Sequence, residues 1–135
     1  MARVIVIAVD AWSKWLEYRV LPHLTLEATA AFLYEKIIAR DSTPAAVRCH
    51  QGTECAGEFL QLCSYLGIAQ HTISMLHPRA NGLIEVYNQE VKAGIWCVAD
   101  LCGEDWWRIL PDIFLALRML PVSKTGCLAF ELVFK

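Results

Sequence analysis

The sequence has few charged residues and no excess of basic ones. Charged side chains make up 19% of the 135 residues, and the formal net charge is −2. Proteins that bind nucleic acid through their overall field are usually basic. Any contact with DNA would therefore have to come from a local group of side chains. A hydrophobic content of 56% excludes a disordered chain.

The six cysteines include no Cys-x-x-Cys pair, and no secretory signal precedes the first apolar segment. Reduced thiols in an intracellular protein, nuclear or cytoplasmic, are therefore expected. The apolar runs are too short to span a bilayer, so no membrane is expected as a partner. A small-molecule substrate is not expected either. One group of residues has zinc-binding side chains but no spacing typical of a zinc site: Cys49, His50, Cys55 and His71.

Hydrophobic periodicity predicts one α/β layered domain over residues 1–135. Strands are expected at residues 3–10, 15–21, 45–49 and 68–74, the first two forming a hairpin. Helices are expected at residues 26–37, 57–66, 81–100, 104–119 and 127–133. Thr25 is placed as an N-cap, Gly67 as a C-terminal cap, and Pro111 either kinks or restarts the fourth helix.

Five segments form an ordered set of motifs, the fourth of which consists of Leu110-Pro111, Ala116-Leu117-Arg118 and Pro121. Residues 10–15 read Asp-Ala-Trp-Ser-Lys-Trp, and residues 49–54 read Cys-His-Gln-Gly-Thr-Glu. Residues 77–85 read His-Pro-Arg-Ala-Asn-Gly-Leu-Ile-Glu, and residues 125–132 read Thr-Gly-Cys-Leu-Ala-Phe-Glu-Leu. In this order and with these gaps, they resemble the catalytic core of retroviral and retrotransposon integrases. The last segment resembles the tail typical of Ty3/gypsy-type elements.

The resemblance covers nearly the whole chain. It implies an RNase H-like integrase core, a mixed sheet flanked by helices, with DNA integration and nucleic-acid binding as its ancestral function. The family's reaction needs two divalent ions, Mg²⁺ or Mn²⁺, held by two aspartates and a glutamate. Glu85 stands at the position of that catalytic, metal-binding glutamate, and His50 stands at the position of the second aspartate. A neutral imidazole adds no negative charge and is a poor Mg²⁺ ligand.

The first carboxylate of the family lies on a strand upstream of the segment matched by Val4–Asp10. We therefore expect the family's first, central strand to be missing. Asp10 is an alternative ligand by residue type, but the resemblance places it in a turn. With Glu85 alone at its family position, we expect no bound metal and no strand transfer, and restoring Asp at position 50 should not restore activity. A missing central strand leaves two strands without a neighbour, which predicts a homo-oligomer.

The resemblance also places a nucleic-acid surface on the expected helix 81–100. Glu85, Gln89 and Lys92 fall on one helix face at i, i+4 and i+7. The candidate contact residues are Asn81, Asn88, Gln89 and Lys92. An ordinary solvated helix face accounts for the same pattern, so both interpretations stay open.

Three functions are compatible with these observations. The first is an integrase-core-like domain that is catalytically inactive and retains DNA binding. The second is a domesticated module that oligomerises and has no nucleic-acid role. The third, the least favoured, is an active nuclease using Asp10, His50 and Glu85. A separate apolar stripe is expected in the core, with part of it as a candidate dimer face: Trp106, Leu110, Ile113 and Leu117.

Overall fold

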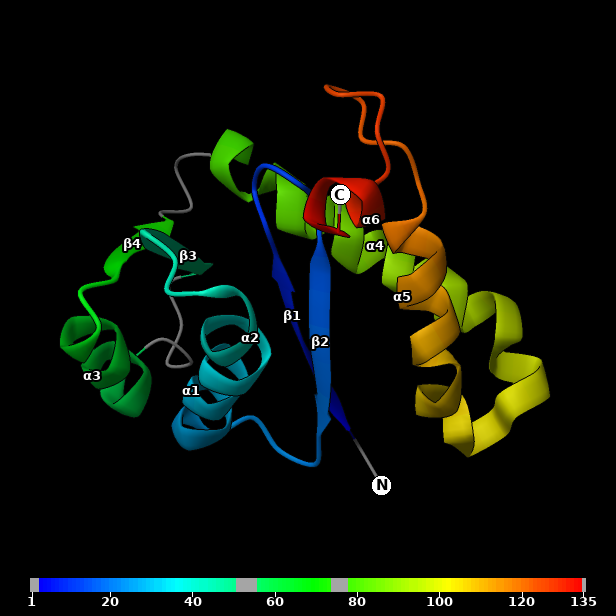
Figure 1. Cartoon of the computed structure of the whole chain (residues 1–135). Coiled ribbons are helices and arrows are strands. Elements are labelled where there is room, and N and C mark those ends of the chain that lie inside the picture. Colours follow the sequence, from blue (N-terminus) through cyan, green and yellow to red (C-terminus); the bar gives the residue numbers. More distant parts are fainter. Residues whose placement is uncertain (1–2, 51–55, 74–77, 135) are drawn as a thin grey trace. The chain divides into compact units, whose positions relative to one another are not determined.

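The chain begins with two strands, continues with helices and two further strands, and ends in helices (Figure 1). The structure, a computed structural model, describes residues 3–50, 56–73 and 78–134, without the side chains of residues 50, 72–73, 78–81, 100, 102 and 104. The strands are β1 (Val4–Val9), β2 (Leu16–Leu21), β3 (Ala46–His50) and β4 (Ala69–Ile73). The helices are α1 (Leu26–Leu33), α2 (Ala39–Asp41), α3 (Gly57–Tyr65), α4 (Pro78–Cys102), α5 (Leu110–Arg118) and α6 (Ala129–Phe134). A π-helical segment covers Tyr34–Ile38, and a 3-10 segment covers Gly103–Ile109.

The described strands form two separate two-stranded sheets, β1–β2 and β3–β4 (Figure 1). The connection between β1 and β2 is too short for a parallel pair, so these strands form the predicted hairpin. β3 and β4 are parallel, with Ala46 opposite Ala69 and His50 opposite Ile73, and α3 makes the crossover between them. The predicted α/β architecture is therefore confirmed, with small sheets, one a hairpin and one parallel, flanked by helices. β1 and β3 are not paired among the described residues.

The chain divides into two compact units. The first consists of Met1–Val6 and Tyr18–Asn81, and the second consists of Ile7–Glu17 and Gly82–Lys135. The prediction of one domain over residues 1–135 stays a prediction. The core of the first unit is formed by Leu33, Cys49, Phe59, Cys63 and Ile68.

Local signals set most element ends in the first unit. The Thr25 hydroxyl accepts a hydrogen bond from the Ala28 amide at 3.1 Å, which confirms the predicted N-cap. Gly67 follows α3 with φ +69, the left-handed conformation that favours glycine at a helix C-terminus. The helix that begins at Leu26 continues beyond its predicted end at residue 37. It passes through the π-helical segment and stops at Ser42, where φ is 126.

In the second unit, the helix predicted at residues 104–119 is divided. Its first part is the 3-10 segment with a kink at Asp105, and α5 then starts with Pro111 in its first turn. Pro111 therefore restarts the helix and does not kink it. Proline suits a first helical turn, because the N–H that it lacks would have no helical acceptor there. The same preference places Pro78 at the start of α4, three residues before the predicted start.

The core of the second unit includes Leu16, Val91, Leu110 and Phe114, each at most 2% exposed. α4 passes close to α5 at Gly94, where a Cβ would lie 3.1 Å from the side chain of Ile113. Leu110 and Leu117 of the predicted apolar stripe are buried, as expected. Trp106 and Ile113 are half-buried, and the candidate dimer face on this stripe stays a prediction. No described helix is both long and apolar enough to cross a membrane.

Candidate active site and nucleic-acid surface

Position 50 lies at the carboxyl end of a parallel strand. His50 is the last residue of β3, and its backbone is in register with Ile73 of β4. In parallel α/β sheets, ligands bind beyond the carboxyl ends of the strands. The side chain of His50 lies outside the described residues, as do all of residues 51–55 and 74–77, including His77. The predicted role of this position therefore stays a prediction.

Glu85 lies on α4 and is exposed to solvent. α4 begins at Pro78 and places Glu85 about two turns inside the helix. Its carboxylate belongs to the second unit, whereas His50 belongs to the first. That Glu85 and His50 together form a catalytic site stays a prediction.

Asp10 is a turn residue. One of its carboxylate oxygens accepts hydrogen bonds from the Ser13 amide at 2.8 Å and from the Ser13 hydroxyl at 2.7 Å. The Asp10 amide donates to the carbonyl of Trp15 at 2.9 Å, and Lys14 takes φ +60 to complete the turn. This confirms the predicted role of Asp10 and commits its carboxylate to the β1–β2 connection.

The described residues do not fit the family's metal site. Two-metal phosphoryl transfer requires several carboxylates gathered around the ions. Among residues 3–49, 56–71 and 82–134, leaving out the side chains of residues 100, 102 and 104, no three His, Cys, Asp or Glu side chains lie close enough together to hold a metal ion. Glu85 thus belongs to no such group in this part of the chain, and no reaction step through a metal follows from it.

Three residues of the predicted contact face on α4 form a row of exposed side chains, which an ordinary solvated helix face would also show. Glu85, Gln89 and Lys92 are all exposed, and the helix places them on one side over about 10 Å. Asn88 is half-buried beside this row. The backbone of Asn81 lies in the first turn of α4, and its side chain is outside the described residues. We call Glu85, Gln89, Lys92 and the following Trp96 the α4 row.

Trp96 belongs to the α4 row, although the sequence motifs gave no reason to include it among the candidate contact residues. Its side chain is 77% exposed, one turn beyond Lys92. A shallow hollow of about 250 Å³ lies beside it, lined by Lys92, Ile95, Trp96 and Trp106. Trp96 follows Lys92 by four residues, and this i, i+4 spacing is the signal in the sequence that the two side chains lie on the same side of the helix.

The ionisable groups of α4 give the row no net positive charge. The described charged side chains of α4 are Glu85, Glu90 and Lys92, and of these Glu85 and Lys92 belong to the α4 row. Burial, and secondarily the negative charge of Glu90, raises the pKa of Tyr87 above its ordinary value. The Tyr87 phenol is therefore neutral at physiological pH and adds no charge to this helix.

No protein-family model matches the chain. The chain is 25% identical over 131 residues to the Gag-Pol polyprotein of Avian reticuloendotheliosis virus, covering 96% of this chain and 11% of that protein. It is 28% identical over 129 residues to the Gag-Pol polyprotein of Walleye dermal sarcoma virus, covering 94% of this chain and 7% of that protein. The chain thus spans about a tenth of the length of these relatives.

Two solved structures share the fold. The catalytic core domain of BIV integrase superposes with a TM-score of 0.77 at 23% identity, over 97% of this chain and 85% of that chain. The simian T-cell lymphotropic virus intasome in complex with PP2A regulatory subunit B56 gamma gives a TM-score of 0.82 at 18% identity, over 97% of this chain and 48% of that chain. The resemblance predicted from the motifs is therefore confirmed, and the chain has the RNase H-like fold of the retroviral and retrotransposon integrase catalytic core.

Proposed function

We propose that this chain is an integrase-core-like domain of Ty3/gypsy-type origin that binds nucleic acid through α4 and does not catalyse strand transfer. The observation that carries the proposal is the row of exposed polar side chains on α4, in a chain with the integrase core fold. The tail motif at residues 125–132 supports the Ty3/gypsy origin. We place the protein inside the cell, in the nucleus or cytoplasm, where such a domain meets nucleic acid.

Loss of catalysis is supported by the residues at the family's ligand positions. Histidine replaces aspartate at position 50, and the Asp10 carboxylate is bonded within its turn. In the family, Mg²⁺ or Mn²⁺ activates the attacking hydroxyl and stabilises the leaving oxygen. Glu85 alone gives a hard cation too few ligands. We therefore propose that neither ion binds here.

A strand-transfer assay with viral-type DNA ends in Mg²⁺ or Mn²⁺ tests this loss. We expect no insertion by the wild type or by His50→Asp, and no binding heat when either ion is titrated in a calorimeter. Insertion by the wild type that Glu85→Gln abolishes would overturn the proposal.

DNA binding by the α4 row has a distinct electrostatic signature. Gln89 and Lys92 offer donors to phosphate oxygens, whereas the exposed carboxylate of Glu85 repels phosphates. Each lysine–phosphate contact releases counterions and contributes about one unit to the slope of log K against log salt. Without a bound metal, removing the charge of Glu85 should therefore strengthen binding, the opposite of its effect in a metal-dependent enzyme.

Fluorescence anisotropy with labelled duplex DNA over a range of salt concentrations tests this signature. Lys92→Gln should weaken binding and lower the slope by about one, and Glu85→Gln should strengthen binding. Lys124→Gln is the matched control, because Lys124 is exposed in the same unit but outside α4. Absence of salt-dependent binding, or equal effects of the two lysine variants, would contradict the proposal.

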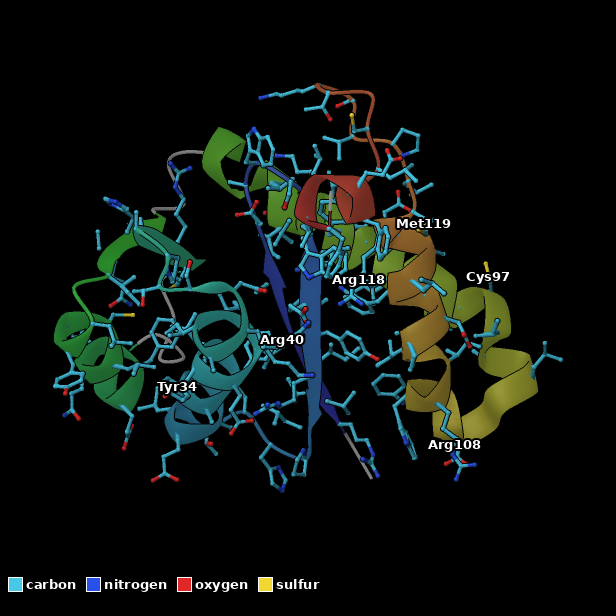
Figure 2. All side chains as sticks on the ribbon, in the orientation of Figure 1. Tyr34, Arg40, Cys97, Arg108, Arg118 and Met119 are labelled. Carbon is cyan, nitrogen blue, oxygen red and sulfur yellow. The ribbon has the colours of Figure 1, made fainter. Side chains whose placement is uncertain are left out.

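A second candidate is an oligomerisation module without a nucleic-acid role. It is favoured by exposed apolar side chains at the end of α5: Leu115 is 56% exposed, and Met119, which directly follows α5 and is labelled in Figure 2, is 45% exposed. We propose a homo-oligomer in either case. Sedimentation velocity tests it: a wild-type monomer that melts cooperatively argues against it, and dissociation by Met119→Glu supports it.

A further inference from the structure

We propose that the hollow beside Trp96 receives an unstacked base of single-stranded nucleic acid, with the Trp96 indole as the stacking surface and Lys92 as the contact to phosphate. This inference rests on the proposed binding of nucleic acid by α4 and specifies its form. It assigns a role to side chains outside the motifs that carry the integrase resemblance.

The hollow has the lining that a nucleobase needs. Trp96 and Trp106 contribute indole rings, Ile95 contributes an aliphatic side chain, and Lys92 contributes the cation. Trp106 meets Trp107 edge to face, with ring centroids 6.2 Å apart at 82°, which fixes the position of that wall. Trp96 is 77% exposed, so most of its surface is available to a ligand.

The α4 row brings a nucleic-acid strand to this hollow. Glu85, Gln89, Lys92 and Trp96 follow each other at helical spacing on one side of α4. Lys92 and Trp96 lie one turn apart, about 6 Å along the axis. A strand whose phosphate contacts Lys92 therefore has a base within reach of the Trp96 ring.

The charge of the hollow favours a nucleotide over an apolar protein segment. An apolar partner would have to desolvate the Lys92 ammonium without offering it a hydrogen-bond acceptor, which is unfavourable. A nucleotide offers a flat aromatic base and an anionic phosphate together. Aromatic side chains beside basic groups are how proteins bind single strands without sequence preference, and each stacked base contributes about 1–3 kcal/mol. A duplex hides its base faces, so the inference predicts a preference for single strands.

Binding of one labelled oligonucleotide, as a single strand and as a duplex in the same buffer, tests the inference. Trp96→Ala should weaken binding of the single strand about 5- to 100-fold and change binding of the duplex less than about twofold. Trp96→Phe should retain most of the affinity. The salt slope should not change in Trp96→Ala, because stacking releases no counterions, whereas Lys92→Gln should lower it.

Trp12→Ala is the matched control. Trp12 is 65% exposed in the β1–β2 connection, outside α4, and its removal should leave both affinities unchanged. Circular dichroism of each variant checks that it is folded. Equal losses in the two tryptophan variants would overturn the inference.

The remaining outcomes separate this inference from the proposed function. If Lys92→Gln weakens binding but Trp96→Ala does not, the hollow is not a base site and the function of α4 stands. If the wild type binds neither form of the oligonucleotide, both proposals are overturned. If Trp96→Ala changes the sedimentation coefficient but not the affinity, a second copy of the chain occupies the hollow, and the inference is wrong.

Discussion

The guanidinium group of Arg118 lies over the indole ring of Trp15, with 4.3 Å from Cζ to the ring centroid. Arg118 donates from Nε to the Leu16 carbonyl at 2.9 Å and from Nη2 to the same carbonyl, and Nη2 lies 3.5 Å from the Glu17 carboxylate. Arg118 thereby joins α5 to the start of β2. Trp15 in turn contacts Phe134 of α6, with ring centroids 5.3 Å apart. The arginine thus holds three elements of the second unit together.

Replacing Arg118 should strongly destabilise the second unit. Arg118→Met keeps an apolar side chain over Trp15 but removes the Arg118 cation from the buried carboxylate of Glu17, which is 6% exposed. Such a loss costs about 3 kcal/mol. Arg118→Lys, which retains the charge but not the planar fork of donors, should cost less. Urea unfolding measures both changes.

Arg108→Met is the control for Arg118. Arg108 is 74% exposed, and its ion pair with Asp105 at 3.5 Å is a surface pair that contributes little. Its removal should change the free energy of unfolding by less than about 0.5 kcal/mol. Similar costs for the two variants would show that Arg118 does not join β2 to α5 as described.

Replacing Gly94 with alanine should destabilise the chain, whereas replacing Gly82 with alanine should stabilise it. Both glycines lie in α4, where alanine is favoured by about 1 kcal/mol. A Cβ on Gly82 meets nothing within 4 Å, so Gly82→Ala should stabilise the chain. A Cβ on Gly94 would lie 3.1 Å from two atoms of Ile113, and overpacking costs about 1–3 kcal/mol. Thermal and urea unfolding of the two variants measure whether each substitution raises or lowers the free energy of unfolding.

A third variant identifies the contact. Adding Ile113→Val to Gly94→Ala removes the Cδ1 atom that lies 3.1 Å from the new methyl group and should recover part of the loss. If Gly94→Ala stabilises as much as Gly82→Ala, the close approach of α4 and α5 is wrong.

The stability of the first unit should fall at alkaline pH because of Cys63. This thiol is 1% exposed, and burial, followed by the influence of Cys49, raises the pKa of Cys63 above its ordinary value of 9.0. The folded state therefore holds the proton more tightly than the unfolded state. The resulting stabilisation is complete below about pH 9 and is lost as the pH rises through the folded-state pKa.

Unfolding midpoints measured from pH 7 to 10.5 test this linkage. Cys63→Ala should lower the stability at neutral pH, because a cavity is left, but flatten its decline above pH 9. Cys97→Ala is the control, because Cys97 is an exposed thiol on α4 (Figure 2). An unchanged decline in Cys63→Ala would rule out this thiol as the titrating group.

Local residue preferences account for the parts of the fold that the sequence predicted well. The β-branched run at Val4–Val9 forms a strand, Thr25 caps α1, and Asp10 closes a turn. Each outcome depends on neighbours within four residues, so it can be inferred without the tertiary structure. The π-helical segment at Tyr34–Ile38 has no such signal, and its residues alone predict an ordinary helix.

Exposure was harder to predict than secondary structure. Trp106 belongs to an apolar stripe, yet it is half-buried and lines a surface hollow, whereas Leu110 of the same stripe is fully buried. Trp96 is equally hydrophobic and lies almost entirely in solvent. Helical periodicity states which residues share a face, but which part of that face is covered depends on where other elements pack. The same limit applies to the site, because spacing along the chain places His50 on a strand and Glu85 on a helix without fixing the distance between their side chains.

Asp10 offers a final test that separates a turn from a metal ligand. Its carboxylate accepts from the amide and hydroxyl of Ser13. Asp10→Ala removes this acceptor and should cost about 1–2 kcal/mol, as a part-buried donor loses its partner. Asp10→Asn retains a carbonyl oxygen for the Ser13 amide and should recover most of that loss in urea unfolding. A metal ligand would behave differently, because the amide lacks the charge that a hard cation requires. If Asp10→Asn is as unstable as Asp10→Ala, and added Mn²⁺ raises the melting temperature of the wild type alone, Asp10 is a ligand and the turn is not its main role.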